Sequence, residues 1–271
     1  MRQKLIDKKA MAALAVLLVY VMTAGAAMAK TDATKKWRYT VEGGGVSIKR
    51  RVNTPRGDLV IPSKLDKRIV TAIGEDAFSG CDSLLSVIIP EGVLKIGSSA
   101  FADCKNLTSV TLPASLTSIG SFAFIRCENL ADLTIPEGVT SIGSYAFTKC
   151  NSLTGIAIPN GVTEISGTAF SWCENLASVT LPNTLTQIGP GAFTRCDSLT
   201  SVTIPKGVTW IGSRAFYTCS GLSSVILPDS VTFIGDEAFS GCRQLVLSVA
   251  EGSYAEQYAK EENIPYLLAA E

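Results

Sequence analysis

Eight cysteines are the residues of this chain with the most obvious capacity for chemistry, because thiols form disulfides, bind zinc and act as nucleophiles. Consecutive cysteines are always 23 residues apart, so the set is Cys81, Cys104, Cys127, Cys150, Cys173, Cys196, Cys219 and Cys242. None belongs to a C-x-x-C pair, and none of the 271 residues is a histidine. The sequence therefore excludes catalytic triads, proton shuttles and zinc sites that need an imidazole.

A phenylalanine stands three residues before each cysteine, so a whole chain segment is repeated and not only the thiol. These residues are Phe78, Phe101, Phe124, Phe147, Phe170, Phe193, Phe216 and Phe239. One unit reads LTSVTIPKGVTWIGSRAFYTCSG from Leu199, with the pattern L-x-x-V-x-I-P-x-x-V-x-x-I-G-x-x-A-F-x-x-C. A period of roughly 20 to 29 residues is typical of a solenoid, in which each turn buries its apolar side against its neighbours. The phenylalanines and cysteines are therefore the predicted structural core.

Each unit must contain short extended segments that hold these core residues. In the unit above, the alternation around Val202 and Ile204 predicts a short strand that ends at Pro205, which lacks an N–H for a continuing ladder. A second extended stretch ends at Gly212, where the chain turns toward Phe216. Successive turns would lie about 4.8 Å apart, so eight turns predict a rod of roughly 40 Å.

The cysteine column has two interpretations. A disulfide needs Cβ atoms roughly 3.8 Å apart, which is shorter than the spacing of about 4.8 Å between equivalent positions of stacked turns. Buried free thiols beside the phenylalanines are the favoured interpretation, and bridges between neighbouring turns are the alternative. A metal site would need thiolates from several turns in one row, which cannot surround an ion tetrahedrally, so neither a metal nor a cofactor is predicted.

Residues 1–29 predict a signal peptide. The cationic start MRQKLIDKK precedes an apolar run that ends in Ala27-Met28-Ala29, and we expect cleavage after Ala29. An uncleaved anchor is the alternative, because the run approaches the roughly 20 residues that span a bilayer. Either way the body of the protein is expected outside the cytoplasm, either secreted or at the cell surface, and no later segment is long and apolar enough to span a membrane.

Three further segments follow the leader. Residues 30–58 predict a linker and a β-hairpin cap around Gly43–Gly45, residues 59–248 the solenoid, and residues 249–271 a C-terminal cap. Caps are expected because an open solenoid end exposes core residues and unpaired strand edges. In the last segment, Ser253 and Glu256 form a capping-box pattern that opens a short helix.

The repeated unit resembles the BspA-like class of leucine-rich repeats, and the match covers residues 59–248 almost without a gap. This resemblance implies a β-rich, right-handed solenoid of about eight 23-residue turns with an N-terminal β-hairpin cap and a short C-terminal helical cap. Known members are typically secreted or surface proteins of bacteria and some parasitic protists, and several are adhesins. Two departures from the pattern, Ser166 in place of the turn glycine and Pro190 before Phe193, are expected to change only local turn geometry.

Catalysis and nucleic-acid binding find no support in the residues. Acidic side chains such as Asp132, Glu137 and Glu164 occupy scattered variable positions without a matching base. After the leader, 20 basic and 23 acidic residues remain, so bulk charge would not hold a polyanion. Gly43–Gly45 lack the helix and lysine of a phosphate loop and predict a hairpin turn.

Side chains that break the repeat are the candidate binding residues. Trp210 and Phe233 replace polar residues before the Ile-Gly pair in consecutive units, and they are either a contact patch or the surface covered by the C-terminal cap. A second group consists of Arg126, Lys149, Trp172, Arg195 and Tyr217 near the F-x-x-C corner. The remaining strand face offers Ser and Thr rows that are typical of exposed strands in general.

These observations predict a secreted or cell-surface, non-enzymatic binding or adhesion module for a protein or glycan of unknown identity. Two alternatives stay open: a self-assembling structural scaffold, and a recognition module attached to an enzyme.

Overall fold

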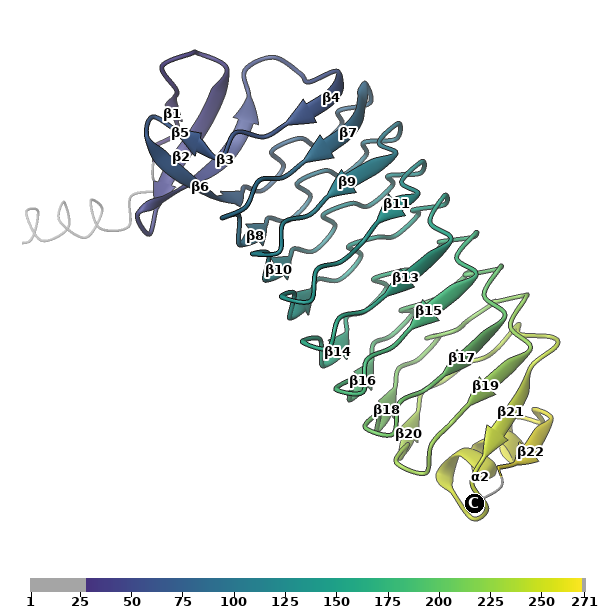
Figure 1. Cartoon of the computed structure of the whole chain (residues 1–271). Helices are drawn as coiled ribbons and strands as arrows, with labels where there is room; N and C mark the ends of the chain where they lie inside the picture. Colours follow the sequence, from purple (N-terminus) through teal and green to yellow (C-terminus); the bar gives the residue numbers. More distant parts are fainter. Residues whose placement is uncertain (1–27, 270–271) are drawn as a thin grey trace, which may run out of the picture.

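The protein is a β-solenoid in the computed structural model, which describes residues 28–269 (Figure 1). The predicted signal peptide lies almost entirely outside these residues and stays a prediction. Within the described range, no helix combines the length and apolarity that a membrane crossing requires. The predicted β-rich leucine-rich repeat solenoid with about 23-residue spacing is confirmed, and the coil makes about ten turns, two more than expected.

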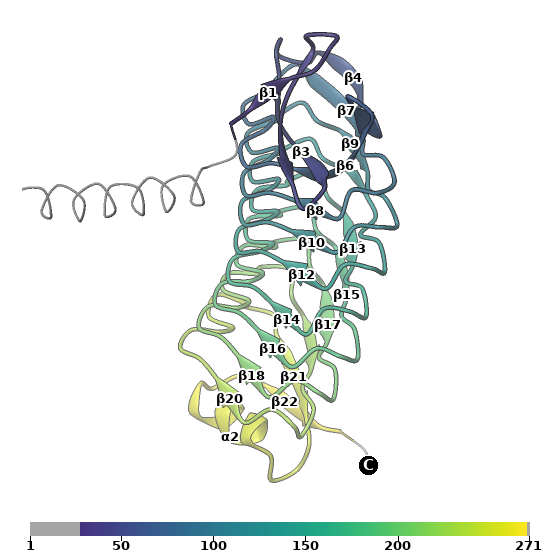
Figure 2. The same cartoon turned by 90° about the vertical axis from the view of Figure 1, so that its left-hand side faces the viewer.

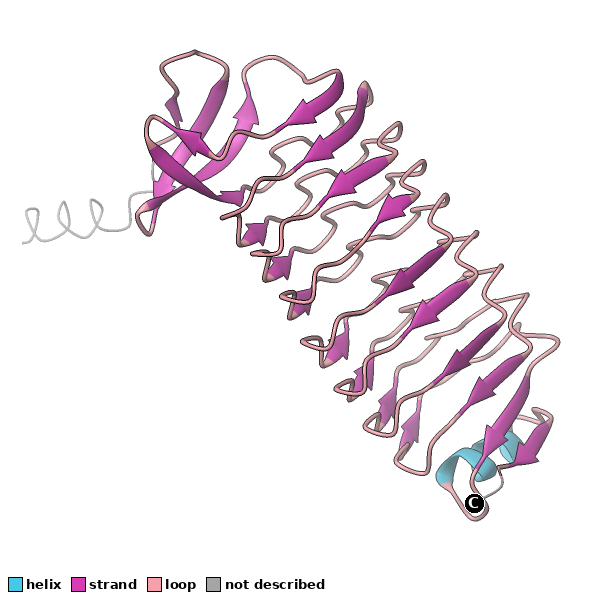
Figure 3. Cartoon of the chain, viewed as in Figure 1, coloured by secondary structure: helices cyan, strands magenta, loops and turns pink. Residues whose placement is uncertain are grey.

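Two rows of short parallel strands run along the solenoid. The first row consists of β4 (Gly57–Val60), β7 (Leu84–Ile88), β9 (Ser109–Thr111), β11 (Asp132–Leu133), β13 (Gly155–Ala157), β15 (Ser178–Thr180), β17 (Ser201–Thr203), β19 (Ser224–Ile226), β21 (Val246–Val249) and β22 (Tyr266–Leu268). The second row consists of β6 (Arg68–Ile73), β8 (Lys95–Ile96), β10 (Ser118–Ile119), β12 (Ser141–Ile142), β14 (Glu164–Ile165), β16 (Gln187–Ile188), β18 (Trp210–Ile211) and β20 (Phe233–Ile234). Equivalent residues pair across turns, so that Ile119 lies opposite Ile142. Figure 3 shows both rows as magenta arrows.

The third side of each turn is built from tight turns and not from strands. Residues two positions before and two positions after each core phenylalanine have left-handed backbone, as at Tyr145 and Lys149, each with φ of 61°. A non-glycine residue in this region carries roughly 1–3 kcal/mol of strain. A hydrogen-bond ladder to the next turn offsets this strain: the N–H groups of Tyr145, Phe147 and Lys149 donate to the carbonyls of Gly167, Ala169 and Ser171.

A single column of stacked aromatic rings forms the centre of the core. Neighbouring phenylalanine rings have centroids 5.1 to 5.6 Å apart and lie nearly parallel. Trp37 closes the column at the N-terminal end at 6.3 Å from Phe78, and Tyr258 closes it at the other end at 6.2 Å from Phe239, both edge-on. The two caps therefore complete the core as well as covering it.

The cysteines form a second column beside these rings. Each thiol from Cys104 to Cys242 donates to the carbonyl of the phenylalanine in the preceding turn, at Sγ–O distances of 3.0 to 3.3 Å. All eight cysteines are unpaired, and all but the half-buried Cys242 are buried. Burial raises the pKa of the Cys127 and Cys173 thiols to about 12. Cys127 and Cys173 are therefore protonated hydrogen-bond donors and poor nucleophiles at neutral pH.

We expect the native protein to resist alkylation at pH 8, because reaction needs a thiolate and access. Labelling by iodoacetamide should reach most cysteines only after unfolding, and intact mass would then rise by up to eight adducts. Cys242 is the internal control, since it is the most exposed of the eight and should react first. An unfolded chain that takes up no label, with a mass lower by eight hydrogens, would contradict the free-thiol interpretation.

Ser166 changes more than the local turn, which corrects our expectation for this departure. At the other turns the glycine N–H donates to an isoleucine carbonyl of the preceding turn, as from Gly143 to Ile119 at 2.9 Å. At Ser166 the side-chain Oγ donates to Ile142 instead, at 2.6 Å. The first row is interrupted between β11 and β13 and again between β15 and β17. The second-row sheet ends at β12 and begins again at β14, which is the strand next to Ser166.

Steric contact explains this interruption. A Cβ added at Gly143 would lie inside contact distance of the Ser121 backbone nitrogen, and one at Gly189 would lie 2.6 Å from the Ile165 carbonyl oxygen. Ser166 carries such a Cβ, so its turn stands away from the preceding one and the ladder opens. Pro190 leaves the ladder intact, since its carbonyl still accepts from Thr168 at 2.9 Å.

A hairpin covers the N-terminal end, as expected. It consists of β2 (Trp37–Glu42) and β3 (Gly45–Arg51), with β1 (Lys30–Thr31) beside β2. β3 pairs in parallel with β6, so the hairpin extends the second row by further strands, and β5 (Lys64–Leu65) pairs with β6 from the longer first loop. Figure 2 follows this row from β3 through β8 to β20, with α2 at the far end.

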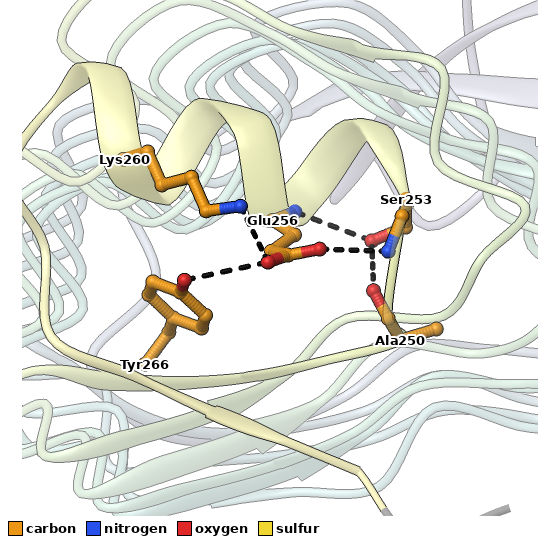
Figure 4. Close-up of polar contacts among 6 residues, drawn as sticks. Ala250, Ser253, Glu256, Lys260 and Tyr266 are labelled. Atoms are coloured by element: carbon orange, nitrogen blue, oxygen red, sulfur yellow. Dashed lines mark hydrogen bonds and ion pairs between the residues drawn. The ribbon is translucent and has the colours of Figure 1, made fainter.

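The C-terminal end is covered by α2 (Tyr254–Glu261), again as expected. Ser253 is the N-cap and accepts from the Glu256 N–H at 3.2 Å. The Glu256 carboxylate accepts from the Gly252 N–H at 2.7 Å and from the Tyr266 hydroxyl, and Lys260 lies 2.6 Å away (Figure 4). Its hydrogen bond with Lys260, above all, lowers the pKa of the Glu256 carboxyl. The side chain thus ties the helix to β22.

Candidate binding surface

Variable side chains on the third side form two ridges beside the buried phenylalanine column. The first ridge holds the residues two positions before each phenylalanine: Asp76, Ser99, Phe122, Tyr145, Thr168, Gly191, Arg214 and Glu237. The second ridge holds the residues two positions after it: Asp103, Arg126, Lys149, Trp172, Arg195 and Thr218. Because every turn keeps the same backbone here, only the side chains differ along each ridge.

Trp172 is the centre of the second ridge. The Arg195 guanidinium carbon lies 4.3 Å and the Lys149 ammonium 5.4 Å from the centroid of the Trp172 ring, both within cation–π range. Arg126 continues the ridge and pairs with Asp103 at 2.9 Å. The structure therefore brings together four of the seven candidate residues, which the sequence placed on successive turns.

An exposed aromatic pair that sequence reasoning missed lies on the first ridge. Phe122 and Tyr145 stack with centroids 4.8 Å apart and ring planes 10° from parallel. Their exposed fractions are 38% and 39%, which is unusual for adjacent large rings. The sequence contains a signal for this pair, because the equivalent residues of the two preceding units are polar, namely Asp76 and Ser99.

A hollow of about 770 Å³ opens between the ridges at Gly191, where the first ridge has no side chain. Trp172 lies on its second-ridge side and Arg214 on its first-ridge side, and Ser171 and Thr194 lie between the ridges. Thr194 Oγ1 donates to the Arg214 carbonyl at 2.7 Å, which joins two turns within this surface. Tyr217, a fifth candidate residue, lies close by, with its ring centroid 5.5 Å from the Arg214 guanidinium carbon.

Charge at this hollow is largely balanced. Glu237 forms an ion pair with Arg214 and raises the pKa of that guanidinium. Beside the hollow, the Arg195 guanidinium lies 3.6 Å from the Asp197 carboxylate. Among the described residues no group of three or more His, Cys, Asp or Glu side chains could hold a metal ion. Besides Arg214, Asp236 and Glu237, the lining offers the Trp172 ring and the hydroxyls of Thr168 and Thr194. A ring beside hydroxyls can recognise ligands by stacking and hydrogen bonding.

Trp210 and Phe233, the remaining two candidates, lie apart from this cluster on the second row. Their rings stack at 5.8 Å, and Phe233 is 43% exposed although α2 contacts its strand. The C-terminal cap therefore does not cover this pair. The two groups of candidates occupy different faces of the solenoid.

Many of the repeated hydroxyls have a structural role. Thr117, Thr186 and Thr232 each donate through Oγ1 to the carbonyl of a residue in the preceding turn, at 2.9 to 3.2 Å. These bonds join neighbouring coils. Threonine recurs at this position because it stabilises the stack. The Ser and Thr rows on the exposed face of the first-row strands are a different set, and their interpretation stays a prediction.

Comparison with known proteins places the chain among repeat proteins. A model of the BspA type leucine rich repeat region matches in six copies over residues 59–176 and 163–252. The crystal structure of a T. pallidum leucine rich repeat protein is similar, with 30% sequence identity over 89% of this chain and 100% of that chain and a TM-score of 0.59. No curated protein sequence matches significantly.

Two further solved structures share part of this likeness. A leucine rich cell surface protein from Faecalibacterium prausnitzii is 21% identical over 87% of this chain and 98% of that chain, with a TM-score of 0.37. A leucine-rich repeat protein from Bacteroides ovatus is 26% identical over 79% and 83%, with a TM-score of 0.38.

Proposed function

The chain belongs to the BspA-type leucine-rich repeat family, and on that premise we propose that it is a non-enzymatic recognition module outside the cytoplasm. Its ligand is a protein or a glycan, bound at the hollow between the two ridges of the third side. The leader at residues 1–29 supports an extracellular location.

The observation that carries this proposal is the contrast between a repeated core and a varied third side. Eight phenylalanines recur without exception, whereas the ridges change from Ser99 to Phe122 and from Lys149 to Trp172. Core packing does not need these exposed rings. Large aromatic residues supply much of the free energy at binding sites when a ligand covers them.

The chemistry of the hollow favours a neutral or weakly charged ligand. Arg214, the arginine that lines it, already has Glu237 as a carboxylate partner, so a polyanion would have to displace that carboxylate. Thr168 and Thr194 supply half-buried hydroxyls beside the Trp172 ring, whereas Ser171 is buried. Sugar rings and protein side chains both bind to such a combination of aromatic surface and hydrogen-bonding groups.

A pull-down against extracellular matrix and cell-surface extracts, followed by a glycan array, tests the proposal. The double variant Tyr145→Ala, Trp172→Ala should bind the captured ligand at least tenfold more weakly, equivalent to about 1.4 kcal/mol. The matched control is Trp210→Ser, Phe233→Ser, which removes two exposed rings from the second row. Each variant loses one stacked aromatic contact, so both should be destabilised by a similar amount of about 0.5–1.5 kcal/mol and should stay folded under the binding conditions.

The opposite pattern of binding losses would assign the binding site to the second row. If the Trp210/Phe233 variant loses binding and the Tyr145/Trp172 variant does not, the second-row pair is the contact patch and the hollow is not. If both variants bind the ligand as tightly as the parent protein does, neither face is the binding site.

A further inference from the structure

The first row of strands has an unpaired edge at each end of the solenoid. β4 is its first strand at the N-terminal end, and β22 is its last at the C-terminal end. Each pairs in parallel with its inner neighbour, β4 with β7 and β22 with β21 (Figure 1). The caps complete the phenylalanine column, but within the described residues neither covers these edges with a strand. Such edges are templates for pairing with another chain.

The hydrogen bonds of β22 identify which of its peptide groups face outward. The Leu247 N–H donates to the Pro265 carbonyl at 2.9 Å, and the Ala269 N–H donates to Val249 at 2.8 Å. In a parallel ladder, alternate residues bond to opposite neighbours. Residues 265, 267 and 269 therefore face β21, and the peptide groups of Tyr266 and Leu268 face the open edge.

The same reasoning applies to β4 at the other end. The Ile61 N–H donates to the Ile88 carbonyl at 3.0 Å, which places Ile61 on the paired side. Asp58 and Val60 consequently present their peptide groups outward. Exposed apolar side chains accompany both edges, with exposed fractions of 65% for Val60 and 51% for Leu268.

The two ends also carry opposite charge. Residues 30–73 contain eleven Lys and Arg against four Asp and Glu, a net charge of +7. Residues 229–269 contain two basic and seven acidic residues, a net charge of −5. In the N-terminal stretch, the described residues include one ion pair, between Lys49 and Glu42. Attraction between such ends would orient two molecules head to tail.

The ends are stepped in opposite senses. At the N-terminal end the second row is the longer one, because β3, β2 and β1 extend it beyond β6. At the C-terminal end the first row is the longer one, because β21 and β22 extend it beyond β19. When two molecules align head to tail, the projecting first row at the C-terminal end of one thus meets the recessed first row at the N-terminal end of the other.

We propose that β22 of one molecule pairs in parallel with β4 of a second copy, so that the last sheet of one first row joins the first sheet of the next. The contact joins two different surfaces and does not close, so it generates an open series of dimers, trimers and longer rods. A polyanionic partner would use the basic end alone and would leave β22 and the acidic end without a role. This assembly is independent of ligand binding at the third side.

Proline substitutions at the outward-facing positions test the contact. Val60→Pro removes one of the two outward N–H groups of β4, and Leu268→Pro removes one of the two of β22, while both leave the bonds to the inner strands in place. We expect the parent protein to form concentration-dependent oligomers in analytical ultracentrifugation at low salt. High salt should weaken them, because the ends attract electrostatically. Each variant alone should remain monomeric, with a circular dichroism spectrum like that of the parent.

Mixing the two variants gives the decisive result. Val60→Pro keeps an intact β22 and Leu268→Pro keeps an intact β4, so an equimolar mixture should form dimers and nothing larger. A parent protein that is monomeric at every accessible concentration would overturn the proposal, and so would a symmetric dimer that neither substitution affects. Monomers that bind vesicles of anionic lipid through the basic end would assign that end to a polyanion instead.

Discussion

Phe147→Ala should lower the free energy of unfolding by about 3–5 kcal/mol, the usual loss when a buried aromatic side chain is removed. Phe147 is fully buried, and its ring lies between Phe124 at 5.4 Å and Phe170 at 5.3 Å. Truncation leaves a cavity that both neighbouring turns line, and the rigid ladders on either side limit its collapse. Urea denaturation followed by circular dichroism measures the change.

Phe122→Ala is the matched control, because it removes the same side chain from the surface of an adjacent turn. Phe122 is 38% exposed and stacks on one ring, Tyr145. We expect a loss of about 0.5–1.5 kcal/mol, the contribution of one aromatic pair. Equal losses from the two substitutions would show that the phenylalanine column is not the dominant core.

Gly143→Ala should destabilise the protein by about 1–3 kcal/mol, as overpacking does. The new Cβ would meet the backbone of Ser121 and Gly120, which cannot move without breaking the ladder. The hydrogen bond from the Gly143 N–H to Ile119 should be lost, and amide hydrogen exchange at residue 143 should accelerate. The result would be a second interruption like the one at Ser166.

Ser166→Gly tests the same cause in the opposite direction. Without the Cβ, the residue 166 N–H is expected to take over the bond to Ile142 that Ser166 Oγ now makes, and its exchange should slow. Gly167→Ala is the control, since its Cβ would lie 3.3 Å from the Pro190 carbonyl oxygen and its φ is not left-handed. Unchanged exchange at residue 166 would mean that the break has a different origin.

Repetition made the fold predictable. A phenylalanine and a cysteine at a constant 23-residue interval require stacked turns, because one turn cannot bury them. The residues that vary were harder to interpret. Ser166 is one substitution in eight units, and its effect depends on how closely the glycine backbones of adjacent turns approach.

The candidate site was predictable in part. Arg126, Lys149, Trp172 and Arg195 share one position in successive repeats, so the sequence places them in line. Their separation from Trp210 and Phe233 on another face follows from the path of the coil. The hollow beside Gly191 was not predictable, because it arises from a missing side chain between Thr168 and Arg214 on neighbouring turns.

The sequence by itself determined the period, the buried columns and the need for caps, since these depend on which residues are apolar and how far apart they are. Only the tertiary structure decided where the ladders open, which aromatic rings stay exposed and where the surface is hollow. These features depend on distances between residues 23 positions apart, and such distances exist only once one turn rests on the next.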